Sequence, residues 1–598
     1  MNWLVFLLVA LAFFAVSVAV AFIINKKTNM KSNRLITPFN TVLTGLFVAT
    51  FFLMIPVYDK ICSGVQLQAL KTILFAIHGT FQVFTIDADP SLITENITES
   101  VGAVAPFYSA LLSVIFVTAP IFTFGFLISF FKNASAYIQL FFKKRKDIYV
   151  FSELNEKSLA LAVDIKIKHP KSAVVFTDVF ENNEEQSYEL IGRAKEIGGI
   201  CFKKDILAVN FRLHSSSKAM YLFAIGTNEA ENIEQALKLI RMYGNVQGSH
   251  LYVFTTRIES ELLLSHNQGI PMRVRRINEV QSLINRVLYE RGTELFRDAL
   301  PVGNNEKKIH AVIAGLGNHG TEMLKALTWY CQMDGYHIEI DAFEKDALAE
   351  ERFTALCPEL MSEAYNGVSV PEETEYTIRI HSGIDVETKA FADSIKEMKD
   401  ITYAFVALGS DENNVKVAVN LRTLFERNKI KSAIHTVVYN SDEKSALLNI
   451  TNYRGQAYNI ECIGDLNSSF SEDVIINSEL ESEALKRHLK WGKEEEFWQY
   501  EYNYRSSVAS AIHMKARIAC GIPGADKSEE ELTDEEEAII KPLEHRRWNA
   551  YMRAEGYIYS GSPEKSSRND LAKMHHDLVD FSSLSEEEKI KDIRVGTK

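Results

Sequence analysis

The sequence predicts three kinds of structure in order along the chain: an N-terminal α-helical transmembrane segment, two α/β units, and a small α-helical domain at the C-terminus. Three observations carry this prediction. Long apolar runs gather in residues 1–146, apolar strands alternate with amphipathic helices over 147–460, and the acidic run 527–538 near the C-terminus ends as a helix start. A chain of 598 residues is too long for a single hydrophobic core, so several domains are expected.

The composition argues against some classes of protein. The formal net charge of −13 at pH 7 is unlike that of a protein that coats nucleic acid, and we expect no nucleic-acid partner. The six cysteines are scattered without a C-x-x-C pair, which favours neither a disulfide framework nor a zinc site and fits a reducing compartment. No metal site is expected, since even the adjacent His575 and His576 have poor ligand spacing for a helix.

Three apolar runs near the N-terminus are expected to span a membrane. Residues 3–24 contain no charged side chain, and a helix of this length is long enough to cross a bilayer. A cleaved signal peptide is the alternative for this run, but no basic segment precedes it and it exceeds the usual length of a signal-peptide core. The second and third runs cover 39–58 and 103–131.

Basic residues set the expected orientation of these spans, because cytoplasmic loops carry an excess of lysine and arginine. The residues concerned are Lys26, Lys27, Lys31 and Arg34 after the first span, and Lys143, Lys144, Arg145 and Lys146 after the third. The segment before the third span carries the acidic residues Asp87, Asp89, Glu95 and Glu99. The pattern predicts a protein of the inner (plasma) membrane with its N-terminus outside and a large cytoplasmic region after residue 146.

The segment 66–90, QLQALKTILFAIHGTFQVFTIDADP, lies between the second and third spans. Its first part is helical in pattern but too short to cross, and it is expected to end at Gly79 before an extended, acidic stretch. This order resembles the re-entrant pore loop of potassium-type channels, but TFQVFTID stands where those channels carry TVGYG, so potassium selectivity is not implied. The alternative is an amphipathic helix on the outer surface of a three-helix anchor.

The strongest local motif is GLGNHG, with Gly315, Gly317 and Gly320. An apolar strand precedes it, an amphipathic helix follows it, and a second strand ends at Glu344. This is the context of the Rossmann fingerprint, in which the glycines admit a pyrophosphate to the helix N-terminus and the acid accepts from ribose hydroxyls. We expect a Rossmann-like unit over 307–460 that binds a nucleotide such as NAD(H) or ATP; the alternative is that its glycines serve packing alone.

An earlier, degenerate copy of this unit is expected over 147–290. Glu153, Asn155 and Ser158 stand where the second unit has its three glycines. A carboxylate would therefore face the pyrophosphate, and no dinucleotide is expected there in the usual pose. Further along, AMYLFAIGTNEAEN from residue 219 parallels TYAFVALGSDENN from residue 402, which supports an internal repeat.

These paired units resemble the RCK (KTN) domains of potassium channels and potassium-uptake systems, chiefly in the motif at 315–320 and in the paired IGTNEAEN and LGSDENN turns. The resemblance covers roughly half of the chain. It implies units that dimerise, change shape on binding nucleotides or ions, and move an attached pore. A homo-oligomer, either a dimer or a tetramer, is expected on this basis.

A Rossmann-like unit can also serve a dehydrogenase, but the sequence shows no hydride-transfer constellation such as Ser-x-x-x-Tyr-x-x-x-Lys. His381 and His435 are interpreted as polar strand-end or loop groups rather than as a general base. We therefore expect no enzyme activity and no catalytic residue.

Residues 500–598 contain E-H-x-R-W at 544–548, R-x-x-G-Y at 553–557, K-x-H-x-D-L at 573–578 and L-S-E-E-E-K at 584–589. These pieces resemble the ryanodine-receptor repeat (RyR) domain, a small helical module also found in bacterial proteins. The sequence departs from that family at His576, where proline is usual, and at Tyr557, where tryptophan is usual. By resemblance, the module is a candidate sensor of an ADP-ribose-type or other modified nucleotide, as in antiviral (antiphage) defence.

The candidate ligand-binding residues of this module are His545, Arg546, Trp548, Arg553, Tyr557 and His575. Guanidinium groups suit phosphate contact, and tryptophan and tyrosine suit stacking on a base. On a helix Arg546 and Arg553 lie about 20° apart, so they are expected to converge on one anion. Trp548 has a competing interpretation as a core anchor, because Tyr551 and Met552 extend an apolar stripe.

Together these features predict a ligand-gated membrane effector, channel-like in layout, whose cytoplasmic region senses a nucleotide-type signal and acts on membrane permeability. The alternative is a housekeeping regulator of potassium or cation transport that senses NAD(H) or ATP through its Rossmann repeats. The expected partners are the membrane and a small nucleotide-type ligand.

Overall fold

A computed structural model of the protein describes residues 3–27, 36–143, 146–179, 185–211, 219–261, 269–303, 306–365, 376–440 and 458–597. The chain forms two compact units, whose bounds differ from those of the two α/β units. One comprises Met1–Leu154 and Lys171–Met220, and the other comprises Asn155–Pro170 and Tyr221–Lys598.

The N-terminal region is helical and apolar, as predicted. Its long helices are α1 (Trp3–Lys27), α2 (Ile36–Ile61) and α5 (Ala105–Phe142). Three stretches are long and apolar enough to cross a membrane, namely Trp3–Val20, Thr41–Ile61 and Glu95–Phe124. Of the basic residues used to orient the spans, Lys31, Arg34, Lys144 and Arg145 lie outside the described residues. Length and composition therefore support three membrane helices, and orientation remains a prediction.

The predicted pore-loop layout is wrong between the second and third spans. Instead of ending at Gly79, helix α3 (Gln68–Thr85) runs through the expected extended stretch, and α4 (Pro90–Val101) follows after a short turn. A Cβ atom at Gly79 would lie 2.4 Å from the hydroxyl of Tyr58 on α2. This glycine therefore lets two helices approach closely and does not break α3, whose exposed side chains include Leu70, Leu74 and Phe81. The geometry agrees with the alternative, an amphipathic helix.

The first α/β unit is built on a six-stranded sheet. Its strands are β1 (Ile148–Phe151), β2 (Ala173–Phe176), β3 (Ile200–Cys201), β4 (Met220–Ala224), β5 (Ser249–Phe254) and β6 (Arg273–Ile277). Their order in the sheet is β3-β2-β1-β4-β5-β6. Strand β1 pairs with β2, β2 with β3, and β5 with β6, all in parallel. The helices that follow strands include α6 (Glu156–Lys168), α7 (Glu185–Glu196), α8 (Glu229–Tyr243) and α10 (Glu279–Arg291).

The second α/β unit repeats this topology. Its strands are β7 (Leu300–Gly303), β8 (Glu306–Ala314), β9 (Tyr336–Glu344), β10 (Tyr376–Ser382), β11 (Tyr403–Val406), β12 (Ala433–Val437) and β13 (Ile460–Ile463). The order is β10-β9-β8-β11-β12-β13, with β7 added antiparallel to β8. Both sheets thus have the strand order of a Rossmann-type fold, which confirms the predicted pair of Rossmann-like α/β units.

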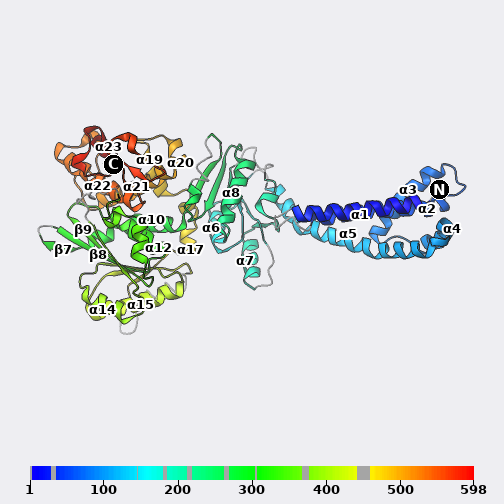
Figure 1. The fold of residues 1–598 in the computed structure, drawn as a ribbon, viewed down its shortest axis with the longest axis horizontal. Coiled ribbons are helices and arrows are strands. Elements are labelled where there is room, and N and C mark those ends of the chain that lie inside the picture. The colour runs from blue at the N-terminus through cyan, green and yellow to red at the C-terminus, as the bar shows by residue number, and fades with distance from the viewer. Residues whose placement is uncertain are drawn as a thin grey trace. The chain divides into compact units, whose positions relative to one another are not determined.

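Helices cover both faces of the second sheet (Figure 1). On one face Ala311 and Ile313 of β8 pack in a core with α10 and with α12 (Asn318–Tyr330). On the other face Val312 and Ala314 pack against α14 (Lys389–Glu397) and α15 (Asp411–Asn428). Because successive side chains of a strand point to opposite faces, β8 is apolar on both sides and belongs to a buried parallel sheet.

Two asparagines at matching positions show that the repeat extends to side chains. The amide of Asn232 on α8 donates to the carbonyl of Phe254 at 2.9 Å, and its oxygen accepts from Gly226 N–H at 2.7 Å. Asn414 on α15 likewise donates to Val437 at 2.7 Å and accepts from Leu408 N–H. Each asparagine ties the turn after one strand to the end of the next, which explains the parallel IGTNEAEN and LGSDENN sequences.

The C-terminal region is mainly helical. It contains α17 (Leu466–Ser469), α18 (Glu472–Ile475), α19 (Glu479–His488), α20 (Glu494–Gln499), α21 (Glu501–Ala519), α22 (Asp534–Ala554) and α23 (Glu586–Gly596). Two short strands, β14 (Ile558–Tyr559) and β15 (Met574–His575), pair in parallel. His575 therefore lies on a strand, and the expectation that it and His576 share a helix is wrong. Residues from α21 and α22 join the core that α10 and α12 build on the second sheet.

Candidate functional sites

The three glycines of the turn after β8 differ in the space that surrounds them. Gly315 has φ +93°, and a Cβ atom there would lie 2.5 Å from the carbonyl oxygen of Ala407. A Cβ atom at Gly320 would lie 1.8 Å from the carbonyl oxygen of Gly315. Both positions therefore need glycine for packing. At Gly317 a Cβ atom would meet no described atom within 4 Å, so this glycine leaves open space at the start of α12.

The other predicted member of this site, Glu344, is partly engaged by the protein itself. One carboxylate oxygen accepts from Leu316 N–H at 2.8 Å and the other from Asp346 N–H at 3.3 Å. Gly317 is the N-cap residue of α12 and has no side chain that could accept from the first N–H groups of this helix. Among the described residues these N–H groups therefore stay available to an anion. His319, within the motif, makes a 2.8 Å hydrogen bond with the hydroxyl of Tyr439.

The corresponding turn of the first unit is closed by side chains. Asn155 Oδ1 accepts from Ser158 N–H at 2.9 Å, and Ser158 Oγ accepts from Asn155 N–H at 2.9 Å. The Asn155 amide also donates to the carbonyl of Ile225 at 2.8 Å. These contacts use the N–H groups that a phosphate would need at the start of α6, which gives a physical reason to expect no dinucleotide there.

The histidines considered for acid–base chemistry have structural partners. Asp341, fully buried on β9, accepts from His310 Nε2 and His381 Nε2 at 2.7 Å each and from Arg379 at 2.9 and 2.7 Å. Burial lowers the pKa of His435 to about 4, and its ring makes a 3.1 Å hydrogen bond with the hydroxyl of Tyr403. The Asp341 cluster and the Tyr403–His435 pair are thus two separate sets of polar contacts on the second sheet.

Three of the six candidate residues of the C-terminal region line one cavity. His545, Trp548 and His575 border a space of about 500 Å³, called here the module cavity, between α19, α21, α22, β15 and α23. The Trp548 and His575 rings meet edge to face at 4.9 Å. His545 Nε2 donates to the carbonyl of Val579 at 2.8 Å, which fixes its ring in the wall. Trp548 also packs against the core, as its competing interpretation predicts, and its role in ligand binding stays a prediction.

The other three candidates lie elsewhere. Arg546 forms a 2.6 Å ion pair with Asp334, whereas the buried Arg553 faces Glu359 at 3.7 Å. The expected convergence of these arginines on one anion is therefore wrong, because each faces a different carboxylate of the second α/β unit. Tyr557 is buried beside Tyr502, with 6.1 Å between ring centroids, and does not line the module cavity.

Several lining residues were not anticipated from the sequence. The basic side chains are Arg487, Arg547, Lys565, Arg568 and Lys591. The acidic side chains are Glu544, Asp577, Glu588 and Asp592. Trp491 and Tyr502 join Trp548 as aromatic walls. One signal was available: Glu544 and Arg547 occupy apolar-stripe positions of α22, between the buried Leu543 and Tyr551.

An ion-pair cluster forms one wall of the module cavity. Glu544 accepts from Arg547 at 2.5 Å and also from Arg517. Burial alone would raise the pKa of the Glu544 carboxyl, but the charges of Arg547 and Arg517 outweigh it and hold that pKa below its ordinary value. Arg487 donates to Ser510 at 2.8 Å and to the carbonyl of Thr597 at 3.1 Å. Two arginines, from α21 and α22, thus share a single carboxylate, and a third from α19 is held by a hydroxyl and a backbone carbonyl.

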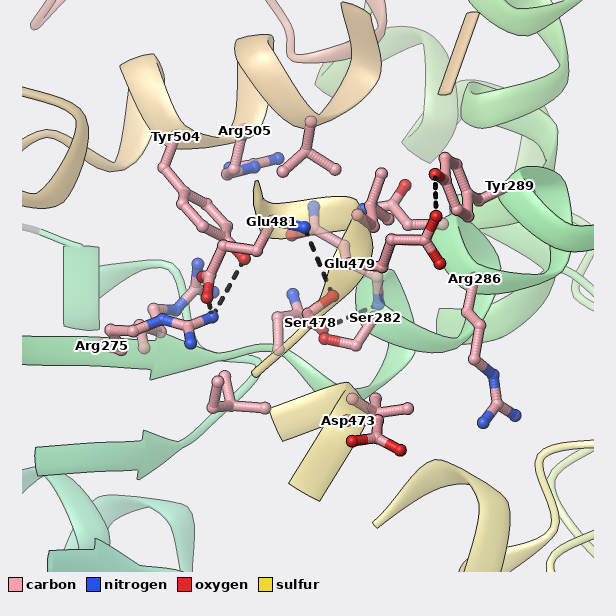
Figure 2. A pocket seen from close by; sticks show the side chains of 18 of the residues that line it. Arg275, Ser282, Arg286, Tyr289, Asp473, Ser478, Glu479, Glu481, Tyr504 and Arg505 are labelled. Carbon is pink, nitrogen blue, oxygen red and sulfur yellow. Dashed lines mark hydrogen bonds and ion pairs between the residues drawn. The ribbon is translucent and has the colours of Figure 1, made fainter. Parts of the chain in front are cut away.

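A second cavity, of about 510 Å³, contains several charged side chains that pair with one another. It is lined by the end of β6 and by α10, α19 and α21. Figure 2 shows Arg275 reaching Tyr504 and Tyr289 beside Glu479. Arg275 donates to the Tyr504 hydroxyl at 3.1 Å and pairs with Glu481, and the Tyr289 hydroxyl donates to Glu479 at 3.4 Å. We prefer the module cavity as the candidate ligand site because three of the six candidate residues and three aromatic rings line it.

Comparison with known proteins adds little to this geometry. No family model matches the chain, and no curated protein matches it. Among solved structures, it is similar to one of the subunits of dipicolinate synthase from Bacillus halodurans. Sequence identity is 11%, over 55% of this chain and 92% of that chain, with a TM-score of 0.19. A likeness this weak carries no argument about function, which must rest on the sites.

The glycine turn yields a matched pair of variants. We expect Gly320→Ala to destabilise the fold by about 1–3 kcal/mol, because its Cβ atom would collide with a backbone carbonyl. Gly317→Ala, with open space around its Cβ atom, should cost below about 1 kcal/mol. Thermal unfolding of the full chain in detergent measures both. Equal midpoints for the two variants would contradict the packing role of Gly320.

The ion-pair cluster yields a second test. Glu544→Gln leaves buried guanidinium groups without their counter-charge and should destabilise the fold by about 3–5 kcal/mol. Glu535→Gln, exposed on the same helix, is the control and should cost below about 1 kcal/mol.

The stabilisation by Glu544 should also depend on pH. Since the folded-state pKa of Glu544 is depressed, its contribution to the free energy of unfolding is present at neutral pH and lost in acid. The gap between wild type and Glu544→Gln should therefore narrow below about pH 4. A gap that widens in acid would contradict the account.

Proposed function

We propose that this protein is a ligand-gated membrane effector. An anionic, nucleotide-type ligand binds in the module cavity, and the resulting change acts on the permeability of the membrane segment. The observation that carries the proposal is the cavity itself, which combines a volume of about 500 Å³ with aromatic walls and buried basic groups. Small-molecule sites combine aromatic surface with placed polar and charged groups that orient the ligand, and this cavity offers both.

The lining chemistry fits a nucleotide better than other small ligands. Trp548, Trp491 and Tyr502 offer ring faces for a base, and arginine side chains offer donors to phosphate oxygens. The resemblance to RyR modules points to an ADP-ribose-derived signal and to a role in antiphage defence. We adopt ADP-ribose as the first ligand to test for this reason.

Helix α22 supplies a route from the module cavity to the second α/β unit. Arg546 and Arg553 on α22 face Asp334 and Glu359 of that unit, and Glu359 also accepts from Tyr559 N–H at 2.9 Å. From α21, His513 meets the carbonyl of Gln332 at 2.8 Å. A shift of α22 on ligand binding would therefore act directly on the second unit, which we propose transmits the change to the membrane helices.

A second candidate function is favoured by the glycine turn. The open space at Gly317 and the uncapped start of α12 suit the phosphates of NAD(H) or ATP. On this proposal the protein regulates potassium or cation transport, as the resemblance to RCK domains implies. A homo-oligomer, dimer or tetramer, belongs to either proposal.

Flux from proteoliposomes tests the first function and separates it from the second. With the full chain reconstituted, ADP-ribose should release trapped potassium, and Trp548→Ala should raise the concentration needed by about tenfold, since a stacking wall is lost. Gly317→Asp places a carboxylate where phosphates would lie at the glycine turn. It should leave the ADP-ribose response intact but abolish any response to NAD(H) or ATP. If Gly317→Asp abolishes the ADP-ribose response and Trp548→Ala leaves it unchanged, the second function is favoured.

The route through α22 has its own test. Glu359→Gln keeps an acceptor for Tyr559 N–H but removes the charge that faces Arg553. ADP-ribose should bind this variant with wild-type affinity, measured by calorimetry, while the potassium release falls several-fold. Unchanged release would contradict the route.

A further inference from the structure

We infer that the side chains of Arg547 and His576 form a phosphate subsite in the module cavity, so that the ligand is a phosphorylated nucleotide and not a nucleoside. The inference rests on the proposed function, because it concerns the same cavity. It replaces the predicted pair Arg546 and Arg553, which face carboxylates of the second α/β unit.

Arg547 carries buried donors that the protein leaves unused. The residue is only 1% exposed, and it lines the module cavity. Its Nη2 donates to Glu544, but Nε and Nη1 make no hydrogen bond within the described part of the chain. Buried polar groups in folded proteins almost always have a partner, so two idle guanidinium nitrogens beside a cavity call for an acceptor that enters it.

His576, which directly follows β15, is a second lining residue with unused nitrogen atoms. It is 7% exposed and lines the module cavity, and neither ring nitrogen hydrogen-bonds a described residue. Its Nε2 lies 3.3 Å from the carboxylate of Asp577, and its ring stacks on His575 at 4.7 Å. A buried imidazole with an unused N–H suits a phosphate oxygen as partner.

The surroundings favour an anion over a metal ion, although His575, His576 and Asp577 place donor atoms within 4.8 Å of one another. His575 Nδ1 already accepts from Asp577 N–H at 3.1 Å, which uses the lone pair of a neutral ring. Burial, followed by the charge of Arg568, lowers the pKa of His575 to about 3. The positive charge of Arg568 would repel a metal cation bound at His575 in the same way. The cavity also has five basic side chains against four acidic ones, and guanidinium nitrogens can only donate.

The subsite also positions the rest of the ligand. Trp548 contacts the His575 ring, and His575 stacks on His576, so an aromatic wall begins beside the phosphate position. A base can therefore stack on Trp548 while its phosphate chain reaches Arg547 and His576. Adenosine, which has the base but no phosphate, should bind only through the aromatic part.

Calorimetric titration of the full chain in detergent, with inorganic pyrophosphate, ADP-ribose and adenosine as probes, tests the subsite. Wild type should bind pyrophosphate, and pyrophosphate should compete with ADP-ribose. His576→Ala should weaken both at least tenfold and leave adenosine binding unchanged, and His576→Gln should restore part of the loss. Arg547→Lys, which keeps a charge for Glu544, should weaken the phosphate probes similarly. His337→Ala, on β9, is the control and should bind as wild type.

The outcomes separate this inference from the proposed function. If Trp548→Ala weakens ADP-ribose binding and His576→Ala leaves it unchanged, the phosphate subsite is wrong and the nucleotide site stands. Pyrophosphate binding that depends on His576, without ADP-ribose binding, would keep the subsite and overturn the nucleotide ligand. If wild type binds Zn²⁺ through His576 and does not bind pyrophosphate, the cluster is a metal site and the inference is wrong. A thermal midpoint equal to wild type shows that each variant is folded.

Discussion

The buried carboxylate of Glu544 is the interaction on which the C-terminal region depends. It is the one acid that Arg547 and Arg517 contact directly within the described residues, and it sits among helices that carry three buried arginines. Removing charges from water is costly, so such a cluster persists only where the partners are well placed. Glu544 orients Arg547 with one nitrogen bound and two left over. The same contact that stabilises the helices therefore prepares the cavity for an anion.

Helix α22 joins the site to the rest of the compact unit because its faces have different partners. Glu544, Arg547 and Trp548 face the module cavity. Arg546 and Arg553 face carboxylates of the second α/β unit. A rigid helix cannot move one face without the other, so a movement of α22 in the cavity would also change the geometry of these ion pairs. Coupling of this kind needs a differential affinity between two arrangements, which the flux and binding measurements report separately.

The sequence predicted the repeated sheets well because strands, glycine turns and amphipathic helices are local patterns. It failed at α3, where Gly79 was interpreted as a break although it admits Tyr58 of a neighbouring helix. It also failed for Arg546 and Arg553. Helical spacing correctly places them on one side of α22, but spacing says nothing about distant carboxylates such as Asp334 and Glu359. The module cavity draws on residues from 487 to 595, a juxtaposition that no spacing rule contains.

The central claim is that the module cavity holds a phosphorylated nucleotide. Mass spectrometry of the small molecules released from the purified full chain tests it most directly, with Trp548→Ala purified in parallel. The account predicts a phosphate-bearing nucleotide, close to one per chain, from the wild-type protein and little from the variant. Equal release from both proteins, or release of a compound without phosphate, would contradict it.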